Sequence, residues 1–500
     1  VEKLVILNRS LPLPFVVDDA QAHVGEETRL RYRYLDMRRK DLLHSLQQRA
    51  TLIKTARRVL EANDFLEVET PTLTPVTPEG AREYLVPSRT QSLHAFALQQ
   101  SPQQFKQTLM IGGVDRYYQV VKCFRDEDLR ADRQPEFTQL DIEMAFANKE
   151  SVIATASEIF MQCFEAVVGE KAPEIKQMSY QYAMERYGSD KPDLRNPLHF
   201  VALDAYCKDA SFKVFQEPAI KEGHRVVGMR LPKGCSLTRK QLDEYTNFVA
   251  EYGAKGLAYI KINDAEAMDS WQSPIIKFFD QATLKAMVKA LDVQTGDCVF
   301  FGAGTNKVVN QSMDALRNRL AADLDLYTCQ WAPVWVVDFP MFEQGDTAGD
   351  WHAVHHPFTA PSVDSVSALR DNFATAKSQA YDLVLNGNEI AGGSVRIHDI
   401  DMQLAALDIL GLDEVAARAK LGHLLTALQY GAPPHAGIAF GVDRFIMLLL
   451  GKASIRDVIA FPKTQSATCM LTNAPSAISA STLKELGLKS AVLQDVEVST

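Results

Sequence analysis

The chain has 500 residues, 46% hydrophobic and 23% charged, which is the composition of an ordinary soluble globular protein with room for several domains. Its formal charge of −10 argues against nucleic-acid binding over the whole surface, so any RNA contact must be a local patch. The seven cysteines form no CxxC pair, no apolar run approaches the ~18 residues of a membrane span, and no signal-peptide pattern opens the chain, so we expect free thiols, no membrane contact and a cytoplasmic location.

The first residues, VEKLVILNRSLPLPF, are typical of the last strand and exit of a preceding domain. We therefore expect residues 1–27 to be a remnant or linker. From Leu46 to Leu60, apolar residues recur at helical spacing, and the pattern stops near Asn63. The alternating run Phe65 to Glu69 follows and predicts a strand that Pro71 ends. On these residues alone, the helix and strand would pack within one subunit.

Two β-like runs, Tyr117 to Phe124 and Phe137 to Phe146, flank a densely charged loop and predict an antiparallel hairpin. Side chains alternate across a strand, so the second run has two different faces. The expected core face holds Leu140, Ile142, Met144 and Phe146, and the expected working face holds Gln139, Asp141 and Glu143.

The loop between the two runs, RDEDLRADRQPE, mixes arginines with five carboxylates. It is too mixed for a simple anion trap and too long for a tight turn. A polyanion bound together with a metal ion fits it better. The alternative is a solvated hairpin tip with surface ion pairs.

Between about Asn196 and Gln330, short apolar runs alternate with helical stretches and predict an inserted α+β domain. The expected strands are Val226 to Leu231, Gly256 to Ile262 and Asp297 to Phe301. The segment GAGTNK at 302–307 lacks the GxxxxGK[ST] pattern of a phosphate loop, so we expect a strand-to-strand turn there.

Three ordered segments resemble the signature motifs of class II aminoacyl-tRNA synthetases. ANDFLEVETPTL at 62–73 is similar to motif 1, FRDED after the first hairpin strand to motif 2, and GIAFGVDRFIMLLLG at 437–451 to motif 3. The sequence resembles the bacterial aspartyl members of the family from about residue 28 nearly to the C-terminus, including the segments QSPQQFKQ, YGSDKPDLRNP and GGSVRI.

The resemblance implies an α+β fold with an antiparallel sheet flanked by helices. It places the first part of the catalytic domain at 28–195, an inserted bacterial-type domain at 196–330 and the second part of the catalytic domain at 331–500. The inserted domain resembles a module shared with a subunit of the tRNA-dependent amidotransferase. The resemblance also implies an anticodon-binding OB-fold before residue 28 and a homodimer formed through the motif 1 region.

For ATP, the chain has no Walker loop, and the HIGH and KMSKS signatures of class I synthetases are also absent. By resemblance, Arg125 binds the α-phosphate, Glu127 and Gln134 contact the adenine end, and Phe137 stacks on the base. Arg444 takes the γ-phosphate and the other face of adenine, near a helix N-terminus that favours anions. The expected ATP site is completed by Asp126, Glu389, Gly441, Val442 and Asp443.

By resemblance, Asp382 and Glu389 are the ligands of an Mg²⁺ ion bound with ATP. Glu389 and Arg396 are seven residues apart, so both could face one cleft only if the strand is irregular, and we predict a bulge at Gly392 and Gly393. The run WHAVHHPF holds three histidines within five residues, but no cysteine or spaced third ligand accompanies them, so we expect no zinc.

By resemblance, Lys106 and Arg396 match the family's positions for binding the side-chain carboxylate of aspartate. Two cations suit this role, because a buried carboxylate needs paired cations. Asp141 suits the α-ammonium, together with Glu79 and Gln103. By resemblance, His355 closes the pocket, His352 lies on the surface, and Ser101 and Arg125 complete the substrate site.

The expected reaction is the formation of aspartyl-adenylate from L-aspartate and ATP, followed by transfer to the 3′ end of tRNA. Arg125, Arg444 and Glu389 are the expected catalytic residues. Three alternatives remain: a noncatalytic synthetase-like protein, a ligase that makes asparagine from aspartate, and a synthetase for asparagine or lysine. Lys106 with Arg396 favours an acidic substrate over the last.

Overall fold

The structure is a computed structural model, and it describes residues 2–18, 23–76, 81–345, 347 and 349–489. The chain divides into two compact units, which are described separately. The first unit comprises Val1–Ala172, Met341–Ala376 and Ile390–Thr500, and the second comprises Pro173–Pro340 and Lys377–Glu389. The predicted insertion at 196–330 falls inside the second unit.

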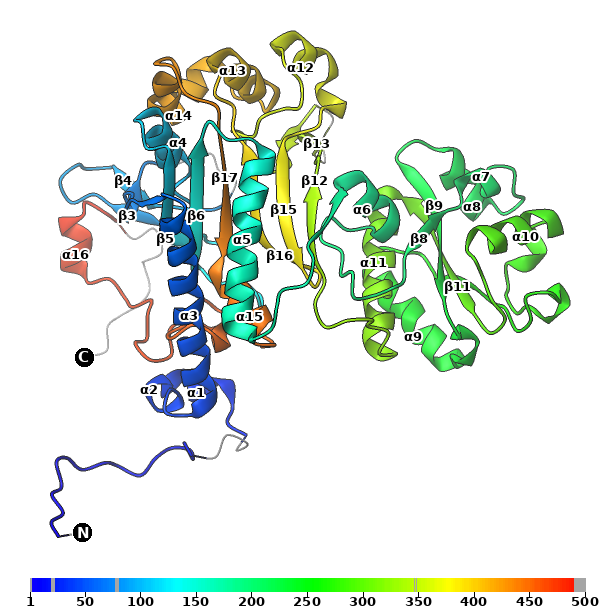
Figure 1. Cartoon of the computed structure of the whole chain (residues 1–500), viewed down its shortest axis with the longest axis horizontal. Coiled ribbons are helices and arrows are strands. Elements are labelled where there is room, and N and C mark those ends of the chain that lie inside the picture. Colours follow the sequence, from blue (N-terminus) through cyan, green and yellow to red (C-terminus); the bar gives the residue numbers. More distant parts are fainter. Residues whose placement is uncertain (1, 19–22, 77–80, 346, 348, 490–500) are drawn as a thin grey trace. The chain divides into compact units, whose positions relative to one another are not determined.

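A mostly antiparallel sheet organises the first unit (Figure 1). Its strands, in spatial order, are β1 (Leu66–Glu67), β5 (Arg116–Phe124), β6 (Glu136–Ala145), β17 (His435–Gly441) and the part of β16 (Asn388–Val395) from Ile390 onward. Only β1 and β5 are parallel. In this register Glu143 lies between Tyr117 and Gly437, and Asp141 lies between Gln119 and Ala439. Strand β6, which carries both carboxylates, is therefore an interior strand of the sheet and not an edge strand.

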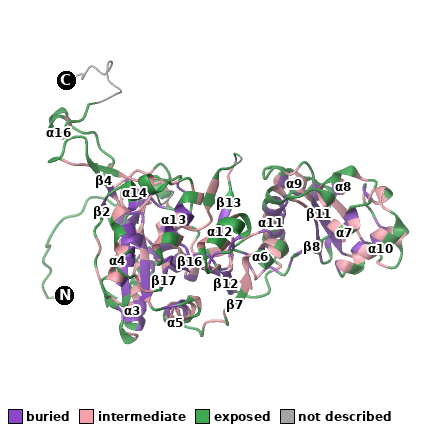
Figure 2. Ribbon diagram, turned by 90° about the horizontal axis from the view of Figure 1, so that it is seen from above, coloured by how far each residue is buried: buried purple, intermediate pink, exposed green. Residues whose placement is uncertain are grey.

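Helices flank this sheet. Helix α3 (Lys40–Ala62) packs against α5 (Lys149–Val168), and α15 (Val442–Leu449) contacts both helices and β6. The rings of Phe160 and Phe445 stack with centroids 5.7 Å apart in this layer. Helix α4 (Gln103–Ile111) contacts β5, β6 and α14 (Glu414–Leu428), and α14 packs on α13 (Ile400–Ile409). The buried residues follow the strands and the sheet-facing sides of these helices (Figure 2).

Helix α5 corrects one expectation from the sequence. By length and composition it is apolar enough to cross a membrane, although we expected no run of that kind. It starts with a capping box formed by Asn148 and Ser151. Its apolar stripe, including Val152, Ile159 and Phe164, is buried in the unit, which is the pattern of a core helix.

Smaller elements complete the first unit. A three-stranded sheet has the order β2 (Leu73–Thr74), β4 (Ala95–Leu98), β3 (Leu85–Pro87), and β13 (Phe342–Gln344) pairs with β14 (Trp351–Ala353). The short helices are α1 (Glu26–Arg31), α2 (Arg33–Asp36), α12 (Val366–Asn372) and α16 (Ala480–Glu485).

The second unit has two groups of strands. In one, β12 (Pro333–Val337) pairs with β7 (Lys176–Ser179) and β15 (Ala380–Leu385). The other is an antiparallel sheet in the order β10 (Ala258–Lys261), β11 (Cys298–Thr305), β9 (His224–Leu231), β8 (Phe200–Ala202). Its helices are α6 (Tyr180–Tyr187), α7 (Asp204–Cys207), α8 (Lys213–Ile220), α9 (Arg239–Ala250), α10 (Gln281–Ala290) and α11 (Asn306–Asp323).

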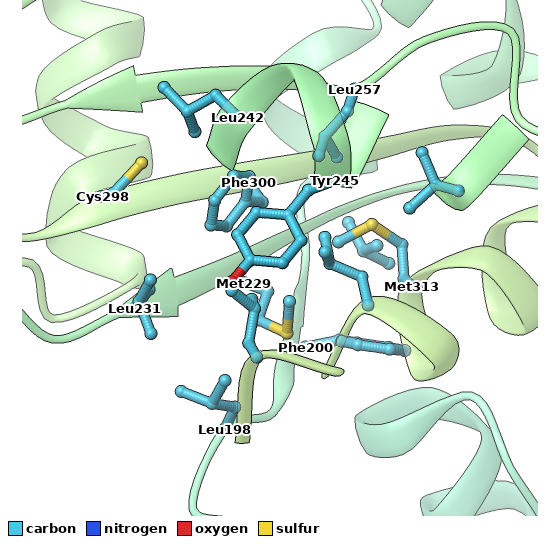
Figure 3. Packing of buried hydrophobic residues seen from close by; sticks show 14 of the residues in the cluster. Leu198, Phe200, Met229, Leu231, Leu242, Tyr245, Leu257, Cys298, Phe300 and Met313 are labelled. Atoms are coloured by element: carbon cyan, nitrogen blue, oxygen red, sulfur yellow. The ribbon is translucent and has the colours of Figure 1, made fainter. Parts of the chain in front are cut away.

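Each face of the antiparallel sheet in the second unit carries an apolar core. On one face Met229 and Phe300 pack against Leu242 and Tyr245 of α9 and Met313 of α11 (Figure 3). The other face packs against α7, α8 and α10. Two covered faces explain why its strands read as nearly continuous apolar runs.

Most of the predicted elements are confirmed: the helix before Asn63, the hairpin and the three strands of the second unit lie where the sequence indicated. Two details were wrong. Phe146 is not in the core: it follows β6 with φ of 54° and is 77% exposed. The segment at 302–307 is not a strand-to-strand turn, because β11 runs directly into α11, with Thr305 as the N-cap.

Candidate active site

Four charged side chains meet on the predicted working face of β6, and each is no more than 2% exposed. Lys106 Nζ lies 2.6 Å from Asp141 Oδ1 and 3.2 Å from Glu143 Oε2. The guanidinium of Arg396 donates two hydrogen bonds to the carboxylate of Glu143, from Nε to Oε1 at 2.9 Å and from Nη2 to Oε2 at 3.1 Å. Both cations therefore contact the same carboxylate oxygen, and the two positive and two negative charges balance.

The Nη1 atom of the Arg396 guanidinium faces a small polar group. Its Nη1 donates to Ser394 Oγ at 2.8 Å and contacts His356 Nε2. His356 Nε2 also lies 3.3 Å from Ser394 Oγ, and Thr359 Oγ1 donates to that hydroxyl at 3.3 Å. The segment around His356 is thus tied to the end of β16.

Local structure explains this convergence. Asp141 and Glu143 are two apart on β6 and so share a face. Lys106 lies one turn into α4, which packs on that face, and β16 pairs with β17 so that Arg396 follows the last paired residue, its N–H donating to His435 O at 2.9 Å. Helix, hairpin and distant strand each supply part of one buried network.

The buried charges perturb their neighbours' pKa values. Burial acts to raise the pKa of Glu143, but Arg396 and Lys106 outweigh it and lower the pKa to about 2. For Asp141, burial prevails over Lys106, so its pKa is raised. Burial, reinforced by Arg396, holds the pKa of His356 well below its usual range, so this imidazole is neutral at pH 7.

Gly437 of β17 lies opposite Glu143 and leaves the space that the carboxylate occupies. A Cβ there would lie 1.9 Å from Glu143 Oε2 and 2.3 Å from the carbonyl oxygen of Ile142. We expect Gly437→Ala to lower the free energy of unfolding by about 1–3 kcal/mol, because backbone cannot yield as a flexible side-chain end does. Amide exchange of peptides from the first unit checks this. Gly422→Ala in the same unit, where a Cβ meets nothing within 4 Å, is the control, and equal losses in the two variants would contradict the expectation.

The predicted ATP residues lie on the hairpin and around α15. The guanidinium of Arg125, at the end of β5, lies over the ring of Phe137 at 5.2 Å from the centroid. Gln134 is buried and makes a reciprocal pair with the backbone of Lys463, Nε2 to O at 3.0 Å and N to Oε1 at 2.7 Å. The amide of Gln134 thus anchors the C-terminal segment beside the hairpin.

The motif 3 residues have distinct surroundings. Arg444 Nη2 donates to Asp132 Oδ2 of the hairpin loop at 3.0 Å. Asp443 is buried and accepts hydrogen bonds from Arg49 of α3 and, at 2.7 Å, from the backbone N–H of Thr138. Its carboxylate therefore links α15 to α3 and β6. Val442 is buried and Gly441 is the N-cap of α15, so a ligand can meet them only through their backbone.

The other predicted residues are more scattered. Asp126 pairs with the exposed Arg82 at 3.2 Å, and Glu127 accepts from Arg133 at 3.0 Å. Gln103 opens α4 and donates to Gln107, whose amide in turn contacts His435. Ser101 lies just before this helix and is partly buried. Glu79 lies outside the described residues.

The two predicted Mg²⁺ ligands, Asp382 and Glu389, belong to the second unit. Burial, then the negative charges of Glu389 and Asp190, raises the pKa of Asp382 well above its usual range. The predicted bulge is wrong, since the strand from Ala391 to Val395 pairs one to one with β17.

The histidines of WHAVHHPF separate in space. His352 is exposed and lies 3.2 Å from Asp350, as expected of a surface residue. His356 contacts Arg396 through its Nε2 atom. Among the residues that the structure describes, no group of three or more His, Cys, Asp or Glu side chains is arranged to hold a metal ion.

Sequence reasoning missed three participants: Glu143 as the bridge between the cations, His356, and Asp132 as the partner of Arg444. The signal for Glu143 was present, because it shares the face of Asp141 by strand alternation. The other two depend on contacts between segments far apart in the chain, which no local pattern reveals.

The architecture is an α+β fold whose mostly antiparallel sheet is flanked by helices, with an arginine and an aromatic ring on its central hairpin, and this is consistent with the catalytic core of class II aminoacyl-tRNA synthetases. A family model described as tRNA synthetases class II (D, K and N) matches residues 25–465. The chain belongs to this family, whose members are ligases that use ATP with Mg²⁺ to aminoacylate tRNA.

Proposed function

We propose that the amino acid is L-aspartate, and that the chain activates it to aspartyl-adenylate and transfers it to tRNA for aspartate. The observation that supports this is the contact of two buried cations, Lys106 and Arg396, with one carboxylate group. We infer that the same two cations bind the side-chain carboxylate of the substrate. Whether tRNA for asparagine is a further acceptor depends on contacts outside this unit.

The hydrogen-bond donors of the two cations explain how an acidic amino acid can bind. Lys106 has three N–H donors and Arg396 presents its Nη1 edge to Ser394, so a side-chain carboxylate can share these cations with Glu143. Lys106 holds Oδ1 of the buried Asp141, and we assign the second carboxylate oxygen, Oδ2, to the α-ammonium. Asparagine, which is neutral, would gain far less from the two cations.

The ATP step rests on the hairpin. Arg125 would meet the α-phosphate, where charge develops as the aspartate carboxylate attacks in line and pyrophosphate leaves. Phe137 offers a face for the base. Arg444 must exchange its partner Asp132 for a phosphate, and because this ion pair is partly exposed, breaking it costs little free energy. We assign catalysis to positioning and charge, with no enzyme nucleophile.

Asp382 and Glu389 would hold the Mg²⁺ ion, which supplies charge neutralisation on the phosphates when it is bound. The negative charge of Glu389 contributes to the raised pKa of Asp382, and a cation bound by both carboxylates would relieve that repulsion, which supports this assignment. No zinc is part of the proposal.

A stability measurement tests this assignment without activity. A carboxyl with a raised pKa stabilises the fold only while protonated, so its contribution falls as the pH rises above its usual value. We expect Asp382→Asn to raise the melting temperature at pH 7.5 without metal, and to remove the rise that Mg²⁺ gives the unsubstituted protein. The control is Glu174→Gln, at an exposed site. An unchanged response of Asp382→Asn to Mg²⁺ would refute the assignment.

We further propose that the protein acts in the cytoplasm as a homodimer formed through the region of α3 and β1. Size measurement by light scattering checks the dimer. A monomer at micromolar concentration would contradict it.

The experiment for the function is exchange of labelled pyrophosphate into ATP with Mg²⁺, run separately with aspartate, asparagine, glutamate and lysine. We expect exchange with aspartate alone. Exchange with lysine or asparagine instead would reassign the amino acid, and no exchange with any of the four would favour a noncatalytic protein.

A further inference from the structure

The antiparallel sheet of the second unit opens at one end, where β10 and β11 part. Strand β11 pairs with β9 along its whole length, from Cys298 to Thr305. Its pairing with β10 covers only Cys298 to Phe301. Within the described chain, the last residues of β11 therefore have a paired strand on one side only.

A cavity of about 350 Å³ lies at this opening. That volume is within the range that small organic ligands occupy. Apolar side chains from both layers of the unit line it, chiefly Phe212, Val214 and Phe215 at α8, Val249 of α9, and Val309 and Met313 of α11. The cavity is thus bounded by three helices and the end of a strand.

Strand β11 contributes Phe301, Gly302 and Ala303 to the wall of this cavity. Gly302 lines it, and a Cβ at this position would lie 2.6 Å from Met313 Cγ. Glycine at 302 lets β11 run this close to α11. With Phe301 and Ala303 on either side, the strand wall is apolar and suits an apolar ligand group.

The charge that the described residues place at the cavity is positive and comes from a lysine. Among the described residues that line the cavity, Lys255 is the only charged one, and it is exposed. It has no ion-pair partner within the described part of the chain. The one hydroxyl in the lining, that of Ser312, donates to Val308 O at 2.7 Å. A ligand that satisfies this site needs an apolar body and one anionic group.

We propose that this cavity binds a small amphiphilic anion, with its aromatic or branched apolar body between α8 and α11 and its anionic group against Lys255. The site lies in the second unit and is independent of the proposed aspartate site. Its ligand is selected by apolar contact area and charge rather than by hydrogen bonds.

The test uses the whole chain and two probes that share an apolar body. 8-Anilinonaphthalene-1-sulfonate carries one anion, and N-phenyl-1-naphthylamine carries none. Fluorescence titration measures the affinity of each, and amide exchange of the peptide from 298 to 309 locates the bound probe. We expect one saturable equivalent of the anionic probe and slower exchange in that peptide.

Two variants with matched controls separate the contributions. Val214→Asp puts an acid on the cavity wall at a residue 58% exposed, and we expect about tenfold weaker binding of the anionic probe. Ile220→Asp, on the same helix at a residue 68% exposed, should have no effect. Lys255→Met should weaken the anionic probe about two- to fivefold and leave the neutral probe unchanged, with the exposed Lys289→Met as control.

Equal affinities of Val214→Asp and Ile220→Asp for the anionic probe would overturn the proposed site. A titration of the anionic probe without a saturable component would overturn it as well. An equal loss of both probes in Lys255→Met would overturn the role of the anion. Circular dichroism reports folding of each variant, and Lys255→Met decides the question if Val214→Asp does not fold.

Discussion

Replacing Glu143 by glutamine should lower the stability of the first unit by about 3–5 kcal/mol, the cost of leaving buried charges without their partner. Glu143 is 0% exposed and is held by Arg396 at 2.9 Å and by Lys106 at 3.2 Å. Glutamine keeps the size of the side chain but not its charge, so the loss is electrostatic rather than a cavity effect.

Amide exchange is the suitable measurement, since a chain with two units need not unfold in one step. Peptides of β6 and β17 should exchange faster in Glu143→Gln, while those of β9 and β11 stay unchanged as an internal control. Glu136→Gln on the same strand, which removes a partly exposed pair with Lys463, should cost at most about 1 kcal/mol. Equal effects of the two variants would refute the structural role of Glu143.

The effect should depend on pH in a defined direction. The pKa of Glu143 is lowered from its usual value of 4.5 to about 2, so its stabilising contribution is complete above pH 4.5 and is lost as the pH falls toward 2. The difference between the unsubstituted protein and Glu143→Gln should therefore shrink over that interval. A difference that grows on acidification would contradict this sign.

Replacing Arg396 by alanine should lower kcat/KM for aspartate in pyrophosphate exchange by about two to three orders of magnitude, the equivalent of losing two charge-assisted hydrogen bonds. KM for ATP should stay within about threefold, because ATP is assigned to other residues. Arg396→Lys keeps the positive charge but not the planar guanidinium. Its kcat/KM for aspartate should lie between the values of the unsubstituted protein and of Arg396→Ala.

The control for Arg396 is Arg418→Ala, which removes an exposed pair with Glu414 on α14. Circular dichroism must show that Arg396→Ala is folded, because Glu143 loses a partner in it. A folded Arg396→Ala variant with kcat/KM for aspartate near that of the unsubstituted protein would remove Arg396 from the amino-acid site.

The hairpin of β5 and β6 was predictable because period-two alternation is a local signal that the sheet preserves. The same holds for α3, whose apolar stripe predicted the buried face. Phe146 was mispredicted because alternation carries no mark of where a strand ends, and its positive φ turns the chain out of the sheet.

The network around Glu143 was only half predictable. Strand alternation placed it beside Asp141, but its role depends on α4 and β16 meeting the same face through tertiary packing. The predicted bulge failed for a related reason: it assumed that Glu389 and Arg396 serve one cleft, whereas the paired part of β16 keeps a regular register.

The most direct test of the central claim is a competition. The protein is given ATP, Mg²⁺ and equal concentrations of aspartate, asparagine, glutamate and lysine, and the adenylates formed are identified by mass spectrometry. We predict aspartyl-adenylate in excess of the asparaginyl product by about four orders of magnitude. Lysyl- or asparaginyl-adenylate as the main product would contradict the assignment of Lys106 and Arg396 to a substrate carboxylate.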